Sequence, residues 1–366
     1  MQIRDIIHLL ESLAHPSLQE SYDNAGLLTG QPGWNCTGVL CTLDATEAVI
    51  EEAKGKGCNL IVAHHPIIFG GLKRLNGHNY VERAVIAAIK ADIAIYAIHT
   101  NLDNVLHGVN AMMADQLDLT DRRVLAPKKN TLLKLHTFVP HAQLEAVRQA
   151  LFDAGAGHIG EYSETSFSMP GTGTFKGSEL TNPFAGSPGT RHEEPESRLE
   201  VILPEYLRSR VLKALLVAHP YEEVAYDFVP LANADSRTGS GLIGRLPVPM
   251  EETAFLEKLL KQFNISQLRH NPLTGKPVLS VAVCGGAGSF LIKQARAACA
   301  DVFVTADVKY HEFFDAEDSL LLADIGHWES EQFTIEGLAA VIQSKFPTFA
   351  VLKSGVRTNP VRYFPG

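Results

Sequence analysis

Residues 59–65 read Asn-Leu-Ile-Val-Ala-His-His, an apolar run that ends in two histidines and is followed by Pro66. A short run that is apolar on both faces is typical of a strand in the middle of a covered sheet. Similar runs occur at 39–44 and 93–100, with helical patterns at 46–56 and 82–91 between them. Strands that alternate with helices predict parallel βαβ units, so this part of the chain is expected to be α/β.

The same alternation returns later in the chain. We expect strands at 279–286, 302–307, 320–324 and 349–354, separated by helices near 290–299, 309–317 and 332–345. Residues 3–14 are predicted to form an amphipathic helix, because their isoleucines and leucines recur at helical spacing. The early and late parts of the chain are therefore both expected to contribute to an α/β core.

The middle of the chain differs in composition. Residues 163–198 are rich in Ser, Thr, Gly and Pro and lack a helical pattern. Strand-then-helix patterns flank this stretch, at 132–154 and at 197–217. Two strand–helix–strand units in succession are typical of a ferredoxin-like arrangement. We therefore expect an α/β core with a mixed or parallel sheet, formed by residues 1–127 and 233–366 and split by an inserted ferredoxin-like α+β domain at 128–232.

The composition restricts the partners and the location of the protein. The 366 residues are 45% hydrophobic, and 32 Lys and Arg against 41 Asp and Glu give a formal net charge of -9. Such a chain can bury a core, but its charge repels nucleic acid and anionic membranes. The sequence has no apolar run long enough for a membrane span, and Asp5 interrupts any signal peptide. The five cysteines are odd in number and contain no CxxC pair, which favours free thiols and a cytoplasmic protein.

Histidines and carboxylates follow the ends of three predicted strands. His64 and His65 close one strand, His99 closes the next, and His327 follows the strand at 320–324. A carboxylate lies four residues after each of the last two histidines, where it shares a helical face with the histidine. Ligands of open α/β sheets bind beyond the carboxyl ends of the strands. The sequence thus predicts a metal site, large enough for two ions, formed by His64, His65, His99, Asp103, His327 and Glu331.

The residue types indicate which metals to expect. Imidazole and carboxylate ligands without thiolates suit zinc, manganese or iron. Further acidic residues near these strand ends have more than one interpretation. Asp23 and Asn24 either support the site or form a turn after the first helix, and Asp44 either orients a ligand histidine or caps a helix. Asp307 and His311 are candidate acid/base groups, although an acid at a helix N-terminus is also ordinary.

Two motifs of the predicted insert are not explained by a metal site. Gly171-x-Gly173-x-Phe175-x-Gly177 has no strand-to-helix context, so a hairpin is expected rather than a phosphate-binding loop. His219-Pro220-Tyr221-Glu222-Glu223 is interpreted either as a functional patch of the insert or as a turn between a helix and a strand.

Five segments of the core together resemble the Nif-three-like dinuclear-metal hexamer family, often described as GTP cyclohydrolase 1 type 2 homologues. They are SYDNAGLL (21–28), VAHHPIIF (62–69), AIHTNLD (97–103), TADVKYHE (305–312) and GHWESE (326–331). The insert is similar to the PII/CutA-like domain of longer members. The resemblance implies two divalent metal ions per subunit, with zinc expected first and manganese or iron as alternatives. It places the metal ligands at His64, His65, Asp103, His327 and Glu331, with His99 as a further ligand or close neighbour.

The resemblance also implies an assembly and an activity. The family forms a toroidal homohexamer whose metal sites face an internal cavity. The implied reaction is hydrolysis of GTP at C8 of the purine, which gives 7,8-dihydroneopterin triphosphate and formate, with Glu331, His311 and Asp307 as acid/base candidates in that order. Two alternatives stay open. One is another metal-dependent nucleotide or phosphoester hydrolase, and the other is a non-catalytic, metal-binding regulatory hexamer.

Overall fold

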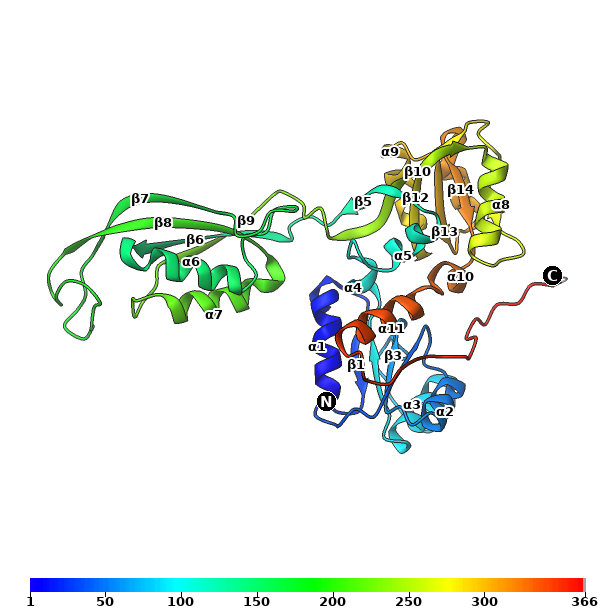
Figure 1. The fold of residues 1–366 in the computed structure, drawn as a ribbon, viewed down its shortest axis with the longest axis horizontal. Helices are drawn as coiled ribbons and strands as arrows, with labels where there is room; N and C mark the ends of the chain where they lie inside the picture. The colour runs from blue at the N-terminus through cyan, green and yellow to red at the C-terminus, as the bar shows by residue number, and fades with distance from the viewer. Residues whose placement is uncertain (365–366) are drawn as a thin grey trace. The chain divides into compact units, whose positions relative to one another are not determined.

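A computed structural model describes residues 1–364 of the chain. The chain forms two compact units (Figure 1). Unit 1 combines Met1–Ala126 with Arg237–Gly366, and unit 2 is Pro127–Ser236. Unit 1 contains two sheets of mixed direction.

The first sheet of unit 1 has five strands in the order β1-β4-β3-β2-β15. Its central strands β2, β3 and β4 run parallel, as the alternation of strands and helices predicted, and β1 is an antiparallel edge strand. The strands are β1 Gly26–Thr29, β2 Val39–Thr42, β3 Leu60–Ala63, β4 Ala94–Ala97 and β15 Val351–Lys353.

Helices cover both faces of this sheet because its central strands are apolar at every position. Val39 and Val62 pack on α1 Ile3–Leu13 and α11 Thr334–Lys345. Their neighbours Leu40 and Ile61 point the other way and pack on α2 Glu47–Gly55 and α3 Tyr80–Lys90. Side chains alternate between the faces of a strand, so each continuous apolar run supplies both cores.

The second sheet of unit 1 has six strands in the order β11-β14-β13-β12-β10-β5. Strands β12, β13 and β14 are parallel, whereas β10 and β11 pair antiparallel with their neighbours. The strands are β5 Thr120–Pro127, β10 Gly239–Met250, β11 Arg269–His270, β12 Val278–Ala287, β13 Val302–Ala306 and β14 Leu321–Asp324.

Helices α5 Val109–Gln116 and α8 Glu252–Gln262 contribute to the core on one face of the second sheet. Helix α9 Ile292–Ala297 contributes to the core on the other face. The helix predicted near 309–317 is present as a 3-10 helix, η5 Tyr310–Ser319. Glu317, near its C-terminal end, has φ 48° and interrupts the helical backbone.

The strand β15 belongs to the first sheet, although it follows the strands of the second sheet in the chain. It pairs parallel with β2, from Val351 opposite Val39 to Lys353 opposite Cys41. The helix α11 leads into it and packs on the first sheet. The chain therefore returns to its N-terminal sheet after it has completed the second one, which the sequence pattern alone did not predict.

Unit 2 is built around one antiparallel sheet with the strand order β7-β8-β6-β9. Its strands are β6 Leu132–Pro140, β7 Ser166–Phe175, β8 His192–Pro204 and β9 Tyr226–Pro230. The helices α6 Leu144–Asp153 and α7 Arg208–Ala218 pack on the sheet through Val147, Leu151, Val211 and Leu215. As expected for a hairpin, the glycine series lies on β7, which pairs along its length with β8 (Figure 1).

Among the described residues, no helix is long and apolar enough to cross a membrane.

Candidate metal centre

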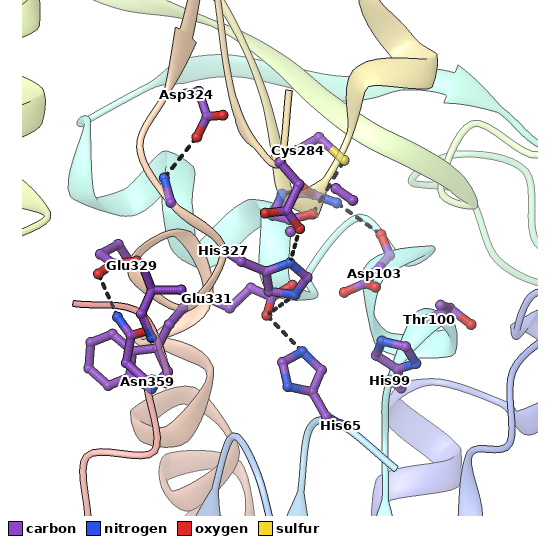
Figure 2. Close-up of a pocket in the computed structure, with 18 of the residues that line it drawn as sticks. His65, His99, Thr100, Asp103, Cys284, Asp324, His327, Glu329, Glu331 and Asn359 are labelled. Atoms are coloured by element: carbon purple, nitrogen blue, oxygen red, sulfur yellow. Dashed lines mark hydrogen bonds and ion pairs between the residues drawn. The ribbon is translucent and has the colours of Figure 1, made fainter. Parts of the chain in front are cut away.

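The side chains predicted to bind metal follow the carboxyl ends of strands from both sheets of unit 1. His64 and His65 come directly after β3, and their backbone N–H groups still donate to Thr42 and Leu43 beside the end of β2. His99 precedes the short helix α4 Thr100–Asp103 after β4. After β14 the chain turns at Gly326, which has φ 92°, and begins α10 His327–Glu331. Figure 2 shows His65, His327 and Glu331 pointing toward one another.

The inward-facing atoms form two overlapping groups. One ligand atom each from His64, His65 and His99 lies within 4.8 Å of the others, and the same holds for His65, His327 and Glu331. Glu331 contacts both groups. Its Oε1 lies 3.7 Å from Nε2 of His64, and its Oε2 lies 2.9 Å from Nε2 of His65 and 3.3 Å from Nε2 of His327. His65 and Glu331 thus occupy the centre of the cluster.

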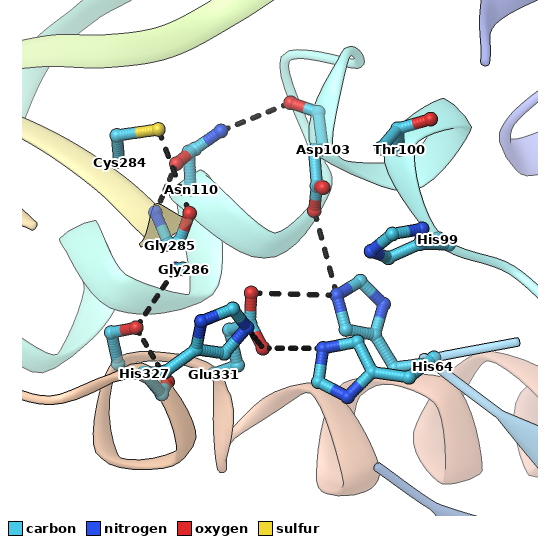
Figure 3. Close-up of polar contacts among 12 residues, drawn as sticks. His64, His99, Thr100, Asp103, Asn110, Cys284, Gly285, Gly286, His327 and Glu331 are labelled. Carbon is cyan, nitrogen blue, oxygen red and sulfur yellow. Dashed lines mark hydrogen bonds and ion pairs between the residues drawn. The ribbon is translucent and has the colours of Figure 1, made fainter. Parts of the chain in front are cut away.

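Asp103 approaches the same nitrogen of His64 as Glu331 does. Its Oδ1 lies 3.7 Å from Nε2 of His64, so this one nitrogen lies near two carboxylates (Figure 3). The side chain of His64 is fully buried, and that of Glu331 is 2% exposed. The cluster therefore has a buried inner part, whereas the side chains of Asp103 and His327 are 25% and 39% exposed.

The outer nitrogen of each imidazole has a fixed partner. Nδ1 of His64 lies 2.8 Å from the backbone carbonyl of Ile98. The other three outer nitrogens face carboxylates: His65 faces Asp44 at 2.8 Å, His99 faces Asp23 at 2.8 Å, and His327 faces Asp307 at 2.6 Å. These acceptors require a proton on Nδ1 and leave the Nε2 lone pair available. Such outer partners orient the histidines of metal sites and increase their basicity.

The buried inner atoms are poorly satisfied by the protein itself. Within residues 1–364, Nε2 of His64, Nε2 of His65, Oδ1 of Asp103 and Oε2 of Glu331 are buried without a hydrogen bond of good geometry. The 2.9 Å approach between His65 and Glu331 is an ion-pair distance without the alignment of a hydrogen bond. Buried polar atoms normally have partners, so four such atoms in one place point to a missing cation. The residues present therefore fit a metal ion.

Glycines at the end of β12 leave room for Glu331. A Cβ on Gly286 would lie 2.5 Å from Oε1 of Glu331 and 3.2 Å from Cε1 of His327, and Gly286 has φ 62°. A Cβ on the preceding Gly285 would lie 2.8 Å from Val109. Only glycine combines this backbone conformation with so close an approach. The Gly-Gly pair in the run VAVCGG is the sequence signal for this part of the site.

Asn110 was not predicted, yet it joins the two sheets beside the cluster. Its Nδ2 donates to the backbone carbonyl of Asp103 at 2.9 Å, and its Oδ1 accepts from the backbone N–H of Gly285 at 3.0 Å (Figure 3). The side chain is 3% exposed. Asn110 thereby fixes the loop that carries Asp103 against the glycines that accommodate Glu331.

The protonation of the cluster follows from its burial and contacts. Burial and the nearby Glu331 raise the pKa of Asp103 to about 7. Burial also opposes ionisation of Glu331, but contacts with His327 and His64 hold its pKa well below the usual range. Burial lowers the pKa of His65 and of His327, yet their carboxylate contacts outweigh it and raise the values to about 10 and about 11. In the metal-free cluster, protonated His65 and His327 therefore supply the positive charge beside the carboxylates.

A cavity of about 1290 Å³ opens beside the cluster. The described residues that line it include seven carboxylates, namely Glu20, Asp44, Asp103, Asp307, Asp324, Glu329 and Glu331. Arg269 is the only Lys or Arg among these described lining residues, and it is paired with Asp324. Aromatic side chains, among them Tyr22, Phe290 and Trp328, form part of the wall. The protein side chains thus give this cavity a strongly acidic lining.

The structure assigns different positions to the weaker candidates. The interpretation of Asp44 as a group that orients a histidine is confirmed by its contact with His65, and the following helix is capped by Thr46 instead. Asp23 likewise supports His99 and accepts from the N–H of Thr100 at 3.0 Å. Asp307 lies behind His327 and lines the cavity, a position that its predicted acid/base role did not anticipate.

The structure does not bring His311 to the cluster. Its ring contacts the rings of Tyr310 and Phe314, at centroid distances of 5.1 and 6.3 Å, and its side chain is exposed on η5. The four-residue spacing from Asp307 suggested a shared helical face, but Asp307 itself has φ 54° and is not helical. The acid/base role of His311 stays a prediction, because within one chain its side chain does not reach the cluster.

Comparison with known proteins identifies the family of the chain. Residues 1–360 match the family described as Duf34/NIF3 (NGG1p interacting factor 3). The chain belongs to the Duf34/NIF3 family. It is 41% identical over 363 residues to a protein of Halalkalibacterium halodurans and 38% identical over 366 residues to one of Bacillus subtilis. In both pairs 98% of each chain is covered, and both relatives are named "GTP cyclohydrolase 1 type 2 homolog".

Solved structures of the Duf34/NIF3 family share the fold over the whole chain. A Bacillus cereus protein related to NIF3 superposes with a TM-score of 0.86 at 38% identity, and 99% of each chain is covered. A Staphylococcus aureus protein, SA1388, gives a TM-score of 0.78 at 29% identity with the same coverage. The family resemblance inferred from the five core segments is therefore confirmed.

Proposed function

We propose that this Duf34/NIF3 chain is a metal-dependent hydrolase whose centre holds two divalent ions. One observation carries the proposal. Four imidazoles have their outer nitrogens fixed by acceptors while their inner nitrogens surround Glu331 and Asp103. The two overlapping groups of ligand atoms would together hold two ions, and Glu331 lies near residues of both groups. Zinc is the first candidate, with manganese and iron as alternatives, because all ligands are imidazoles and carboxylates.

The bound ions would supply a water of lowered pKa and polarise the group under attack. The protein supplies the orientation. Asp44, Asp23 and Asp307 keep a proton on the outer nitrogen of their histidines and so hold the lone pair of Nε2 inward. Glu331 is the first acid/base candidate, because its carboxylate contacts both ligand groups. Asp307 also lines the cavity and ranks above His311 on position alone.

GTP is the first substrate to test, since the relatives carry the name of a GTP cyclohydrolase homologue. The reaction would open the imidazole ring of the purine at C8 and release formate. The acidic lining of the cavity affects this choice of substrate. Arg269 is the only Lys or Arg among the described lining residues, so with metal-bound, neutral histidines the charge that attracts a triphosphate would have to come from the bound ions. A substrate with fewer negative charges would be accommodated more easily by one chain.

Two other functions would use the same cluster of histidines and carboxylates. The first is hydrolysis of another nucleotide or phosphoester, which the acidic lining favours if the substrate carries less charge than GTP. The second is a regulatory protein that binds metal without turnover. A regulatory protein would bind its metal fully, hydrolyse no nucleotide and respond to a ligand of unit 2.

The decisive experiment compares the wild-type chain with Glu331→Gln and Glu336→Gln. All three proteins are loaded with zinc, manganese or iron, their metal content is measured, and GTP turnover is followed by the fluorescence of the oxidised neopterin product. Glu336 lies on α11 and pairs with Lys353 at 2.9 Å, so its substitution is a matched control. We expect turnover in wild type and Glu336→Gln only. Wild-type protein that holds two ions and hydrolyses no nucleotide or phosphoester would contradict the proposed enzyme.

We also propose a toroidal homohexamer and a ferredoxin-like, PII/CutA-like identity for the insert. The order of elements in unit 2, β6-α6-β7-β8-α7-β9, and the sheet order β7-β8-β6-β9 support the second proposal. Light scattering coupled to gel filtration tests the hexamer. A mass corresponding to one or two chains would contradict it.

A further inference from the structure

Two motifs that the metal centre does not use line a single cavity in unit 2. The cavity has a volume of about 640 Å³. The glycine series contributes Gly171, Gly173, Phe175 and Gly177, and the other motif contributes Tyr221, Glu222 and Glu223. The first motif lies at the end of β7, and the second lies between α7 and β9. Segments about fifty residues apart in the chain therefore form one concave site.

Aromatic rings form the walls of this cavity. The ring of Tyr221 lies 6.0 Å from that of Phe175 and 6.1 Å from that of Phe184, with tilted planes in both cases. Phe138 and Met169 complete the apolar lining, and their side chains are 37% and 51% exposed. Large apolar side chains that stay exposed around a hollow are typical of a binding site.

Glu196 places a fixed negative charge in the lining. It is 7% exposed, and it is the only buried charged residue among the described residues that line the cavity. Its Oε1 accepts a hydrogen bond from the Tyr221 hydroxyl at 2.7 Å. A Cβ on Gly173 would collide with the same carboxylate, so the glycine motif is needed where Glu196 approaches β7. The Glu196 carboxylate and the Tyr221 ring are thus held together in the wall of the cavity.

The segment 176–191 closes one side of the cavity through residues of the same two motifs. Both carboxylate oxygens of Glu222 accept from the backbone N–H of Asn182, at 3.1 and 3.3 Å. At the base of this segment, the N–H of Gly189 donates to the carbonyl of Gly177 at 2.8 Å. These contacts hold Phe184 beside Tyr221. The site is therefore formed before a ligand binds.

The charges of the lining favour a cationic ligand. Three carboxylates, Glu196, Glu222 and Glu223, face two cations, Lys176 and Arg198. Arg198 lies 3.1 Å from Glu200, outside the lining, and Lys176, Glu222 and Glu223 are exposed. The buried charge is a carboxylate that lies against an aromatic ring. Cations bind to the faces of aromatic rings, and a carboxylate beside those rings strengthens the preference.

We propose that unit 2 binds a small organic cation, an amine with an aromatic or apolar body, in this cavity. The ammonium group contacts Glu196 and the face of Tyr221, and the apolar body lies between Phe175, Phe184 and Met169. This site is independent of the metal centre, because all of its lining residues belong to unit 2.

Methionine NMR on the full-length chain gives a local test. Of the five methionines, only Met169 lies in unit 2, so its labelled methyl group reports on the cavity while Met1, Met112, Met113 and Met250 serve as internal controls. The probes are benzylammonium, its neutral isostere benzyl alcohol, and the anion benzoate. We expect benzylammonium to shift the Met169 signal in a saturable way, with benzyl alcohol at least about tenfold weaker and benzoate inactive.

Substitutions in unit 2 complete the test. Glu196→Gln keeps the size of the side chain and removes its charge, so it should weaken benzylammonium binding by about tenfold or more. Tyr221→Phe should weaken it less, and Glu205→Gln, an exposed acid outside the cavity, should leave it unchanged. A Met169 signal that does not shift with benzylammonium would overturn the proposal. So would equal responses to all three probes, or unchanged binding by both Glu196→Gln and Tyr221→Phe.

Discussion

Oδ2 of Asp307 accepts a hydrogen bond from Nδ1 of His327 at 2.6 Å, across twenty residues of sequence. The two residues meet because they follow neighbouring parallel strands, β13 and β14, which pair Thr305 with Asp324. Asp307 adopts φ 54°, and this left-handed turn aims its carboxylate at the imidazole. The contact directs Nε2 of His327 toward Glu331.

Replacing Asp307 should weaken metal binding without unfolding the protein. In Asp307→Asn the left-handed backbone is tolerated, since Asn adopts positive φ more readily than most residues. The loss of charge lowers the basicity of His327, and outer partners of this kind contribute roughly 10–100-fold to metal affinity. Metal retention during titration with a chelator measures the effect. Asp315→Asn, an exposed acid on η5, is the control and should match wild type.

Gly286→Ala should remove metal by displacing Glu331. The new Cβ would lie 2.5 Å from Oε1 of Glu331, at a residue with φ 62°. Gly275→Ala provides a matched control, because Gly275 has φ 72° and open space around its Cβ position. Both variants should lose about 1 kcal/mol of stability through backbone strain. Only Gly286→Ala should also lose metal, as measured by elemental analysis, and equal metal content in the two variants would argue against the close-approach role.

The stabilisation by metal should increase with pH. In the metal-free protein the pKa values of His65, His327 and Asp103 are raised to about 10, 11 and 7. Groups with raised pKa values hold protons longer in the folded state, so the free energy of unfolding falls as pH rises through these values. The pKa of Glu331 is lowered, so its contribution is already complete above its ordinary value of 4.5.

Metal ions require the deprotonated forms of the same ligands, so binding at pH 7 should release about one proton each from His65 and His327 and a further fraction from Asp103. Urea unfolding of metal-loaded and chelator-treated protein between pH 6.5 and 9 measures the difference. We expect the difference in unfolding free energy to grow with pH, and calorimetry in buffers of different ionisation enthalpy to detect the protons. A difference that is constant or shrinks over this range would show that these histidines do not exchange protons for metal.

Asn110→Ala should destabilise unit 1 and disturb the position of Asp103. The substitution leaves the carbonyl of Asp103 and the N–H of Gly285 without the partner that now joins them. A buried group without a partner costs about 1–3 kcal/mol. Thermal unfolding measures the loss. Asn79→Ala, which removes the cap of α3 away from this cluster, is the comparison: it should cost about 1 kcal/mol and leave metal binding intact.

The strand ends of the metal centre were predictable because short-range patterns encode them. The run that ends in His64 and His65 marks both a buried strand and its carboxyl end. The spacing of His327 and Glu331 corresponds to one turn of helix, and the structure forms that turn as α10. Since parallel strands present their ends on one side, such residues are expected to meet.

Other parts of the site depend on packing between distant segments. Nothing in the sequence near Asn110 shows that it faces Gly285, because the two are 175 residues apart and on different elements. The pairing of β15 with β2 likewise depends on which sheet edge is open. His311 illustrates the opposite error, in which a correct spacing falls on a segment that is not α-helical.

The position of β15 also determines when the first sheet can be completed during synthesis. The partner strand of β2 is synthesised more than 300 residues after β2 itself. Glu331 is likewise synthesised long after His64. Unit 2, in contrast, closes its sheet between residues 132 and 230 and has all of its strands while the ribosome is still translating the second sheet. During most of translation the nascent chain therefore contains His64 and His65 without Glu331. The proposed metal site is complete only after α10 has been synthesised.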